Sequence, residues 1–361
     1  MNQLFRWDQM GSFLLALAAG ILPFAVPEVC AAALREGLAL CCGPLLLSLF
    51  PFLVVSRLLV QCPESDLLAL PFRLAAWGIG IRTPCAARVL CIGFLGGFAP
   101  AASAAAQAVR TGQLTAEEAD ALLPACICSG PSFVVLTVGQ SLLGSAELGV
   151  LLFASQITAN YLTAALLNRF AGVRSVKPGS AAPASPAPPR LDEILADAAI
   201  TYCKLCGFIL FFRMLAAGAG ALLPDGAGTL CSILLEVCSG CDLASRTGRW
   251  GSLLCCAALS VQGLSVLLQV RTICPPEMTL RPLYRARMLH LPLSLALFYL
   301  LLPGGEADVF STLPARVLLM RRVPPDCALL VFAVCCMAAC TLRSGVRQVE
   351  QKQMARNAGG C

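Results

Sequence analysis

The stretch RVLCIGFLGGFAPAASAAAQAVRTGQLTAEEADALLPACICSGPSFVVLTV, residues 88–138, decides the fold. It contains two apolar segments, and each is broken near its middle. Gly96, Gly97 and Pro100 interrupt the first segment, and Ser129–Ser132 interrupts the second. A broken helix at membrane depth is tolerated where its freed N–H and C=O groups line a cavity and do not face lipid. The stretch therefore predicts half of a binding site inside a membrane.

The composition is that of a polytopic membrane protein. Of 361 residues, 58% are hydrophobic and 13% are charged, whereas soluble domains are nearer half apolar and a quarter charged. The formal net charge is +6, but no basic block with interleaved aromatic residues predicts nucleic-acid binding. The sequence contains no Walker A loop, no HExxH motif and a single histidine. We therefore expect neither an enzyme nor a cofactor.

Hydropathy predicts an all-α membrane protein. A span needs about 20 apolar residues, and eight candidates are 11–27, 37–60, 124–142, 147–168, 198–223, 250–270, 287–303 and 325–342. Two Gly-rich, interrupted stretches, 88–108 and 229–245, are each either a full span or a re-entrant hairpin. With eight transmembrane helices and two re-entrant hairpins, every strongly basic segment falls on the cytoplasmic side, as the positive-inside rule requires, and only Arg321 and Arg322 fall on the outer side. Both termini are then cytoplasmic.

The chain divides around a Pro/Ala/Ser-rich cytoplasmic linker. The predicted parts are an N-terminal transmembrane helix (1–34), a first repeat (35–172), the linker (173–192), a second repeat (193–275), C-terminal transmembrane helices (276–342) and a basic cytoplasmic tail (343–361). The two repeats align in the same order: Arg57 with Arg213, Gly97 with Gly240, and Ser129–Ser132 with Ser260–Gly263. They enter the membrane from opposite sides, which makes the repeat inverted. Inverted repeats with broken helices place a substrate site near the midplane.

The breaks supply the candidate substrate-binding residues. Half-helix N-termini offer backbone N–H groups and a dipole that favours an anion, and serine or glutamine side chains add hydrogen-bond donors. Small residues that only permit close helix packing are the alternative. The candidates are Gly96, Gly97, Ser103, Ser129, Gly130, Ser132, Arg213, Ser239, Gly240, Ser260, Gln262, Gly263 and Ser265.

Charged residues within apolar runs suggest further roles. An arginine at membrane depth is expected to face a cavity or a partner, so Arg213 either contacts the ligand or pairs with Glu236, while Arg57 can also snorkel. Glu236 is a coupling group, a partner for Arg213 or Lys204, or an interfacial residue. Glu236 and Arg57 together are the candidates for a coupling group or a structural ion pair.

Several other residues are expected to have structural roles. Thr115 to Glu118 form a capping box that opens a short helix to about Leu123, with its acids on a solvated face. Residues 66–80 form an interfacial helix, Asn160 bonds between helices, and the single histidine, His290, anchors at the interface. Most of the 21 cysteines lie in apolar runs, where they act as small hydrophobes and not as metal ligands.

Residues 93–102, 110–139, 234–245 and 259–270 carry a resemblance that covers about residues 35–275. There the chain resembles the nucleoside-recognition (Gate) domain family, in particular its branch of sporulation integral membrane proteins of the YlbJ and SpoVV type. Gln262 stands where the family favours His. The resemblance implies that the two repeats are Gate-like. It also implies transport of dipicolinate, a small aromatic dicarboxylate, across the outer forespore membrane of a spore-forming bacterium.

Other functions stay open at this point. Related Gate-domain proteins include nucleoside transporters, so a nucleoside or a related small solute is the near alternative. A membrane scaffold for spore assembly that transports nothing is the other. The expected partners are a small-molecule anion and the lipid bilayer, without nucleic acid, and association into a homo-oligomer stays open.

Overall fold

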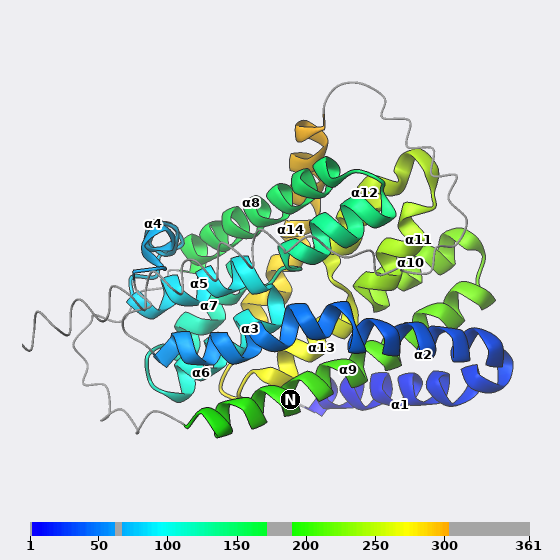
Figure 1. Cartoon of the computed structure of the whole chain (residues 1–361), viewed down its shortest axis with the longest axis horizontal. Helices are drawn as coiled ribbons and strands as arrows, with labels where there is room; N and C mark the ends of the chain where they lie inside the picture. The colour runs from blue at the N-terminus through cyan, green and yellow to red at the C-terminus, as the bar shows by residue number, and fades with distance from the viewer. Residues whose placement is uncertain (1, 62–66, 172–189, 303–361) are drawn as a thin grey trace, which may run out of the picture.

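The computed structural model describes residues 2–61, 67–171 and 190–302, and all its regular elements are helices (Figure 1). The predicted span at 325–342 and the basic tail at 343–361 lie outside the described residues. So does the predicted linker, except for its last three residues. Among the described residues, the chain is therefore an all-helical protein.

The first part of the chain forms nine helical elements. They are α1 (Asn2–Ala25), α2 (Pro27–Cys42), α3 (Pro44–Gln61), α4 (Leu70–Gly78), α5 (Pro84–Gly96), α6 (Phe98–Arg110), α7 (Ala116–Cys126), the π-helix η2 (Ser132–Leu142) and α8 (Ala146–Ala171). The second part forms α9 (Leu191–Leu222), α10 (Asp225–Leu235), α11 (Val237–Ser245), the short 3₁₀ helix η3 (Gly248–Trp250), α12 (Gly251–Val261), α13 (Gly263–Ile273) and α14 (Arg281–Leu301).

Three described helical segments are long and apolar enough to cross a membrane. They are α8, α9 and the segment Gly248–Ile273, which holds α12 and α13. The pair α1 and α2 qualifies as a fourth, although it bends by 111°, where Pro27 opens α2. The predicted span at 37–60 differs from this arrangement, because it straddles the junction of α2 and α3 at Gly43.

Helices end at three of the four predicted breaks, which confirms those three, whereas the break predicted at Ser239 and Gly240 lies three residues earlier, at Glu236, and both residues are inside α11. Gly97 separates α5 from α6, and residues 127–131 separate α7 from η2. Glu236 separates α10 from α11, and Gln262 separates α12 from α13. Two of these junctions contain residues with positive φ, which an α-helix does not contain: Gly97 (+81°) between α5 and α6, and Gln262 (+61°) and Gly263 (+69°) between α12 and α13. Positive φ suits glycine and is uncommon for glutamine.

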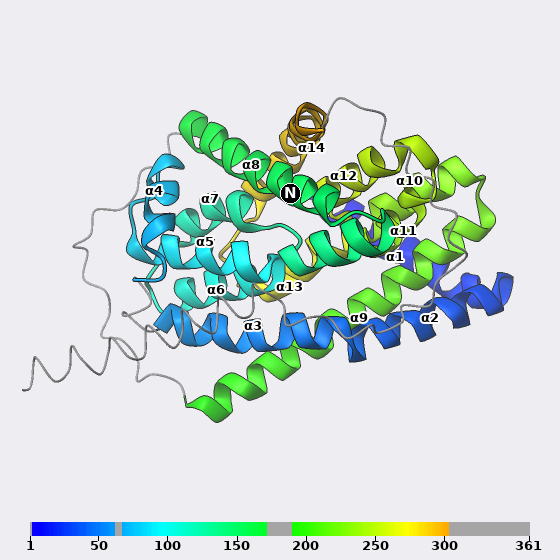
Figure 2. The ribbon, with the colours of Figure 1, turned by 45° about the horizontal axis from the view of Figure 1, so that its top comes forward.

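Alanine lets the elements at the first break approach one another closely. Nearly every alanine of α6 is fully buried, and its neighbours α5 and α7 are buried along most of their lengths. Figure 2 shows α5, α6 and α7 gathered beside α3, with α10 and α11 toward the opposite end of the molecule. Small side chains at these contacts bring helix backbones together, so the breaks can meet in the interior.

The acidic residues of α7 correct one expectation and confirm another. The capping box of Thr115 and Glu118 is present, although α7 continues to Cys126. The predicted solvated face is wrong for Glu118 and Asp120, which are both buried. Glu118 accepts a 2.6 Å hydrogen bond from Thr83 Oγ1. The acids fold inward because they satisfy donors on neighbouring loops, which a sequence pattern alone does not reveal.

Candidate functional site

The four breaks meet as two pairs. A Cβ atom built on Gly97 would stand 2.7 Å from the amide nitrogen of Gly130, so the α5–α6 junction touches the α7–η2 break. A Cβ atom built on Gly263 would stand 2.9 Å from the amide nitrogen of Glu236, so the α12–α13 break touches the α10–α11 junction. At both contacts, only glycine leaves room for the opposing backbone.

A cavity lies where the two pairs face each other, and we call it the break cavity. It measures about 70 Å³ and draws its polar lining from both pairs: Ser129 and Ser132 from one side, Glu236 from the other, and Gln269 from α13. Leucine, phenylalanine, valine and isoleucine side chains supply most of the remaining wall. A mostly apolar wall with a few converging polar groups is typical of a small-molecule site.

Glu236 caps the helix that follows it. Its carboxylate is 2% exposed and accepts hydrogen bonds from the amides of Cys238 (2.9 Å) and Ser239 (2.7 Å) at the start of α11. A buried anion at a helix N-terminus is stabilised by these donors and by the helix dipole. The N–H groups predicted to receive a substrate are therefore already engaged within the chain: that of Ser239 by the Glu236 carboxylate and that of Gly240 by the Glu236 backbone carbonyl.

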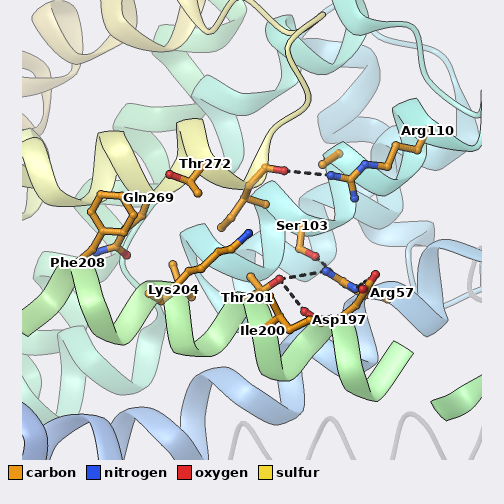
Figure 3. Close-up of a pocket in the computed structure, with 13 residues that line it drawn as sticks. Arg57, Ser103, Arg110, Asp197, Ile200, Thr201, Lys204, Phe208, Gln269 and Thr272 are labelled. Carbon is orange, nitrogen blue, oxygen red and sulfur yellow. Dashed lines mark hydrogen bonds and ion pairs between the residues drawn. The ribbon is translucent and has the colours of Figure 1, made fainter. Parts of the chain in front are cut away.

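A second cavity, which we call the basic cavity, lies between α3, α6, α9 and α13. It measures about 170 Å³, and the charged residues Arg57, Arg110, Lys204 and Asp197 line it (Figure 3). Three cations and one acid give this wall a surplus of two positive charges. Clefts lined by one sign of charge attract solutes of the opposite sign.

Arg57 is the best-connected side chain of the basic cavity. Its guanidinium forms a 2.7 Å ion pair with Asp197 of α9, a residue that sequence reasoning did not single out. It also donates to Ser103 Oγ (3.3 Å) and to Thr201 Oγ1 (3.2 Å). These contacts join α3, α6 and α9.

Gln269 connects the two cavities, because it lines both. Its side chain is 2% exposed, and Nε2 donates a 2.9 Å hydrogen bond to Ser265 Oγ. The side-chain oxygen is buried and has no hydrogen-bond partner among the described residues. A buried polar atom without a partner is rare and points to a role with a ligand or water.

The structure divides the predicted site residues into three groups. The break cavity is lined by Gly96, Ser129, Gly130, Ser132 and Glu236, and the basic cavity by Ser103 and Arg57. The remaining candidates line neither cavity: Gly97, Arg213, Ser239, Gly240, Ser260, Gln262, Gly263 and Ser265. Gly97 and Gly263 still act at the breaks through their backbone.

Arg213 differs most from its prediction. It does not pair with Glu236 but forms a 2.8 Å ion pair with Glu36 of α2. Glu236 was the acid considered within the same repeat, but α2 packs along α9 and supplies the partner. Arg213 therefore links α9 to α2 and lines neither cavity.

A polar network occupies the interior next to the breaks. Ser260 Oγ accepts from Gln156 Nε2 (3.0 Å) and contacts Ser294 Oγ at 2.5 Å, so its hydroxyl is engaged within the protein. His290, predicted at the interface, is instead buried, with Nε2 3.2 Å from the Gln156 carbonyl oxygen. The predicted bond of Asn160 between helices is confirmed, because its Nδ2 donates to the Ile127 carbonyl (3.3 Å).

Sequence reasoning missed Asp197, Gln269 and Arg287. Asp197, Thr201 and Lys204 recur at i, i+4 and i+7 on α9 and therefore share one face, as the common lining of the basic cavity requires. That periodicity of polar residues within a long apolar helix was the available signal. Arg287 lies next to a basic loop, and no pattern distinguishes it from topology-determining arginines.

The loop that follows α13 is held in place by hydrogen bonds to Asp120 of α7. Asp120 accepts hydrogen bonds from the amide and hydroxyl of Thr279 (2.8 and 2.6 Å) and from the amide of Leu280 (3.1 Å). Burial, together with the nearby Asp120 carboxylate, raises the pKa of the Cys274 thiol to about 12. This thiol is therefore protonated and unreactive at neutral pH.

The cysteines show no metal arrangement within the part of the chain that the structure describes. There, every described cysteine is free, and no three His, Cys, Asp or Glu side chains lie together as metal ligands would. The comparisons give no relative to reason from, since no protein-family model, curated protein or solved structure matches this chain.

Proposed function

We propose that this chain is a membrane transporter that moves a small aromatic dicarboxylate, such as dipicolinate, through a site between its broken helices. The observation that carries the proposal is that the four breaks touch in two pairs and that both pairs contribute residues to one cavity. Broken helices that line a midplane cavity are a recurrent way for transporters to build a substrate site.

The arrangement of the hairpins supports a topology of eight spans with two re-entrant hairpins in inverted repeats. In Figure 1, the α5–α6 hairpin lies toward the left end of the molecule, and the α10–α11 hairpin lies toward the right end. Arg88 near the start of α5 donates to Gln113 just after α6 (2.9 Å), so this hairpin begins and ends on one side. The positive-inside rule assigns that side to the cytoplasm.

The charges of the basic cavity support an anionic solute. The surplus of two positive charges lies in a cavity that shares the lining residue Gln269 with the break cavity. The choice of dipicolinate and of the outer forespore membrane comes from the resemblance to the sporulation branch of the Gate family.

At about 70 Å³, the break cavity is smaller than the roughly 300–1,000 Å³ of common ligand sites. One set of breaks must therefore move against the other for the solute to pass.

A nucleoside is the second candidate, and one observation favours it. No cation lines the break cavity within the described part of the chain, whereas the carboxylate of Glu236 does. A neutral solute with N–H and O–H donors fits such a wall, and the unpartnered oxygen of Gln269 offers it an acceptor.

Uptake into proteoliposomes tests the proposal. The full chain is reconstituted, and uptake of radiolabelled dipicolinate is compared with uptake of a labelled nucleoside and with empty vesicles. Dipicolinate uptake above empty vesicles is expected, and Gln269→Leu is expected to lower it at least tenfold because the substitution blocks the junction of the cavities. Gln140→Leu is the matched control, since Gln140 is exposed on η2.

The other outcomes separate the alternatives. Uptake of the nucleoside alone would replace the proposed substrate. No uptake of either solute by a folded protein would contradict transport and favour the scaffold.

A further inference from the structure

The ion pair of Arg57 and Asp197 joins a buried cation to an exposed acid. The Arg57 side chain is 9% exposed, whereas that of Asp197 is 66% exposed. Both line the basic cavity, and Figure 3 shows the two side chains next to each other, Arg57 from α3 and Asp197 from α9. The cation, Arg57, is therefore buried in the protein, and its counter-ion, Asp197, is exposed.

Arg57 keeps two neutral partners that do not depend on Asp197. Ser103 Oγ and Thr201 Oγ1 both accept from its guanidinium, and the Thr201 hydroxyl in turn donates to the backbone carbonyl of Asp197 (2.8 Å). If the Asp197 side chain rotated away, the guanidinium would keep its position. Its charge would then need another anion, because a buried charge without a counter-ion is strongly unfavourable.

Two further cations surround the same space. The Lys204 side chain points into the cavity from α9, and Arg110 reaches from α6 to the carbonyl of Ile273 (3.5 Å) (Figure 3). Asp197 is the only acid that lines the cavity among the described residues. A carboxylate that replaced Asp197 on Arg57 would leave Lys204 and Arg110 facing the rest of the solute.

We infer that the basic cavity is a carboxylate-binding site that Asp197 occupies until a solute carboxylate displaces it. The exchange replaces one carboxylate with another on the same guanidinium, so the buried charge of Arg57 stays paired, and the displaced Asp197 carboxylate is exposed. A second carboxylate on the solute matches the remaining cations, which favours a dianion over a monoanion. The inference deepens the proposed function, since this site is the entrance from which the solute reaches Gln269.

A binding measurement on the purified full chain in detergent tests the inference without any need for transport. Dipicolinate is titrated by calorimetry, with the monoanion picolinate and the neutral pyridine-2,6-dicarboxamide as comparison probes. Asp197→Asn removes the internal competitor. If Asp197 holds Arg57 for about 90% of the time, the apparent dissociation constant for dipicolinate falls about tenfold. Asp192→Asn on the same helix is the matched control, because Asp192 pairs with Arg190 outside the cavity.

The expected order of affinity is dipicolinate, then picolinate, with no binding of the diamide. Unchanged or weaker dipicolinate binding by a folded Asp197→Asn protein would overturn the exchange. If Asp197→Asn does not fold, Lys204→Met carries the test, because Lys204 is exposed. It is expected to weaken dipicolinate binding at least fivefold, and an unchanged affinity would refute the site.

The two proposals fail in different ways. Dipicolinate binding that responds to Asp197→Asn, without uptake into vesicles, would leave the site standing and reject transport. Uptake of dipicolinate with no effect of Asp197 or Lys204 on binding would leave transport standing and reject this site.

Discussion

Arg287 on α14 donates a 3.3 Å hydrogen bond to the carbonyl oxygen of Ser260, in the last turn of α12. Its other terminal nitrogen donates to the carbonyl oxygen of Ile127, which follows the last turn of α7. The carbonyls at a helix end have no partner within the helix and carry the negative end of its dipole. One buried cation therefore serves the carboxyl ends of two broken helices, one from each half of the chain.

Replacing Arg287 should loosen both broken helices together. Arg287→Gln is expected to lower the free energy of unfolding by about 2 kcal/mol or more, because buried carbonyls lose a charged donor. Thermal unfolding in detergent, followed with a thiol-reactive dye on the buried free cysteines, measures the change. Arg285→Gln is the control, since Arg285 is exposed on the same helix. Equal melting temperatures for the two variants would contradict the role of Arg287.

Gly263 should tolerate no side chain. Gly263→Ala adds a Cβ atom 2.9 Å from the Glu236 amide at a φ of +69°, so both the conformation and the contact become unfavourable, by about 1–3 kcal/mol for the conformation alone. We expect dipicolinate uptake to fall to the level of empty vesicles.

Gly248→Ala separates these two effects. Gly248 has φ +64° with nothing within 4 Å of the added atom, so this variant carries the conformational strain without the contact. It should keep its uptake. A similar loss in both variants would show that the contact between the breaks does not matter.

Asp120 should stabilise the turn before α14. Leu280 has φ +58°, an uncommon conformation for leucine. Asp120 accepts hydrogen bonds from the backbone amides of Thr279 and Leu280. Asp120→Ala is expected to cost about 3 kcal/mol, typical of lost hydrogen bonds to a buried charged group. The same dye-based unfolding measures it, and Glu117→Ala on the exposed face of α7 should change little.

Reporter fusions test the membrane topology. If α5 and α6 form a re-entrant hairpin, Gly112 faces the cytoplasm and Gly144 the opposite side. Green fluorescent protein fused after Gly112 should then fluoresce, and alkaline phosphatase fused after Gly144 should be active. The reverse pattern would mean that residues 88–108 cross the membrane as a full span.

The breaks were predictable because their signals are local. Gly97, Gly263 and the run Ser129–Ser132 interrupt apolar segments wherever those segments fold, so sequence alone located these three breaks. The break at Glu236 was predicted three residues too late, at Ser239 and Gly240. The capping box of Thr115 and Glu118 is similarly local. By contrast, the predicted partner of Arg213 and the predicted interfacial position of His290 were wrong, because the residues that they contact, Glu36 and Gln156, lie far away in sequence.

The sequence by itself determined that the chain is apolar and helical, and where three of its four breaks lie, since composition and glycine conformation act within a few residues. Only the tertiary structure decided which breaks touch, that Glu236 caps α11, and that Arg57 meets Asp197. Those contacts depend on how helices far apart in the chain pack together. Hydrogen bonds and ion pairs of a few ångströms are formed by that packing and leave no periodic trace in the sequence.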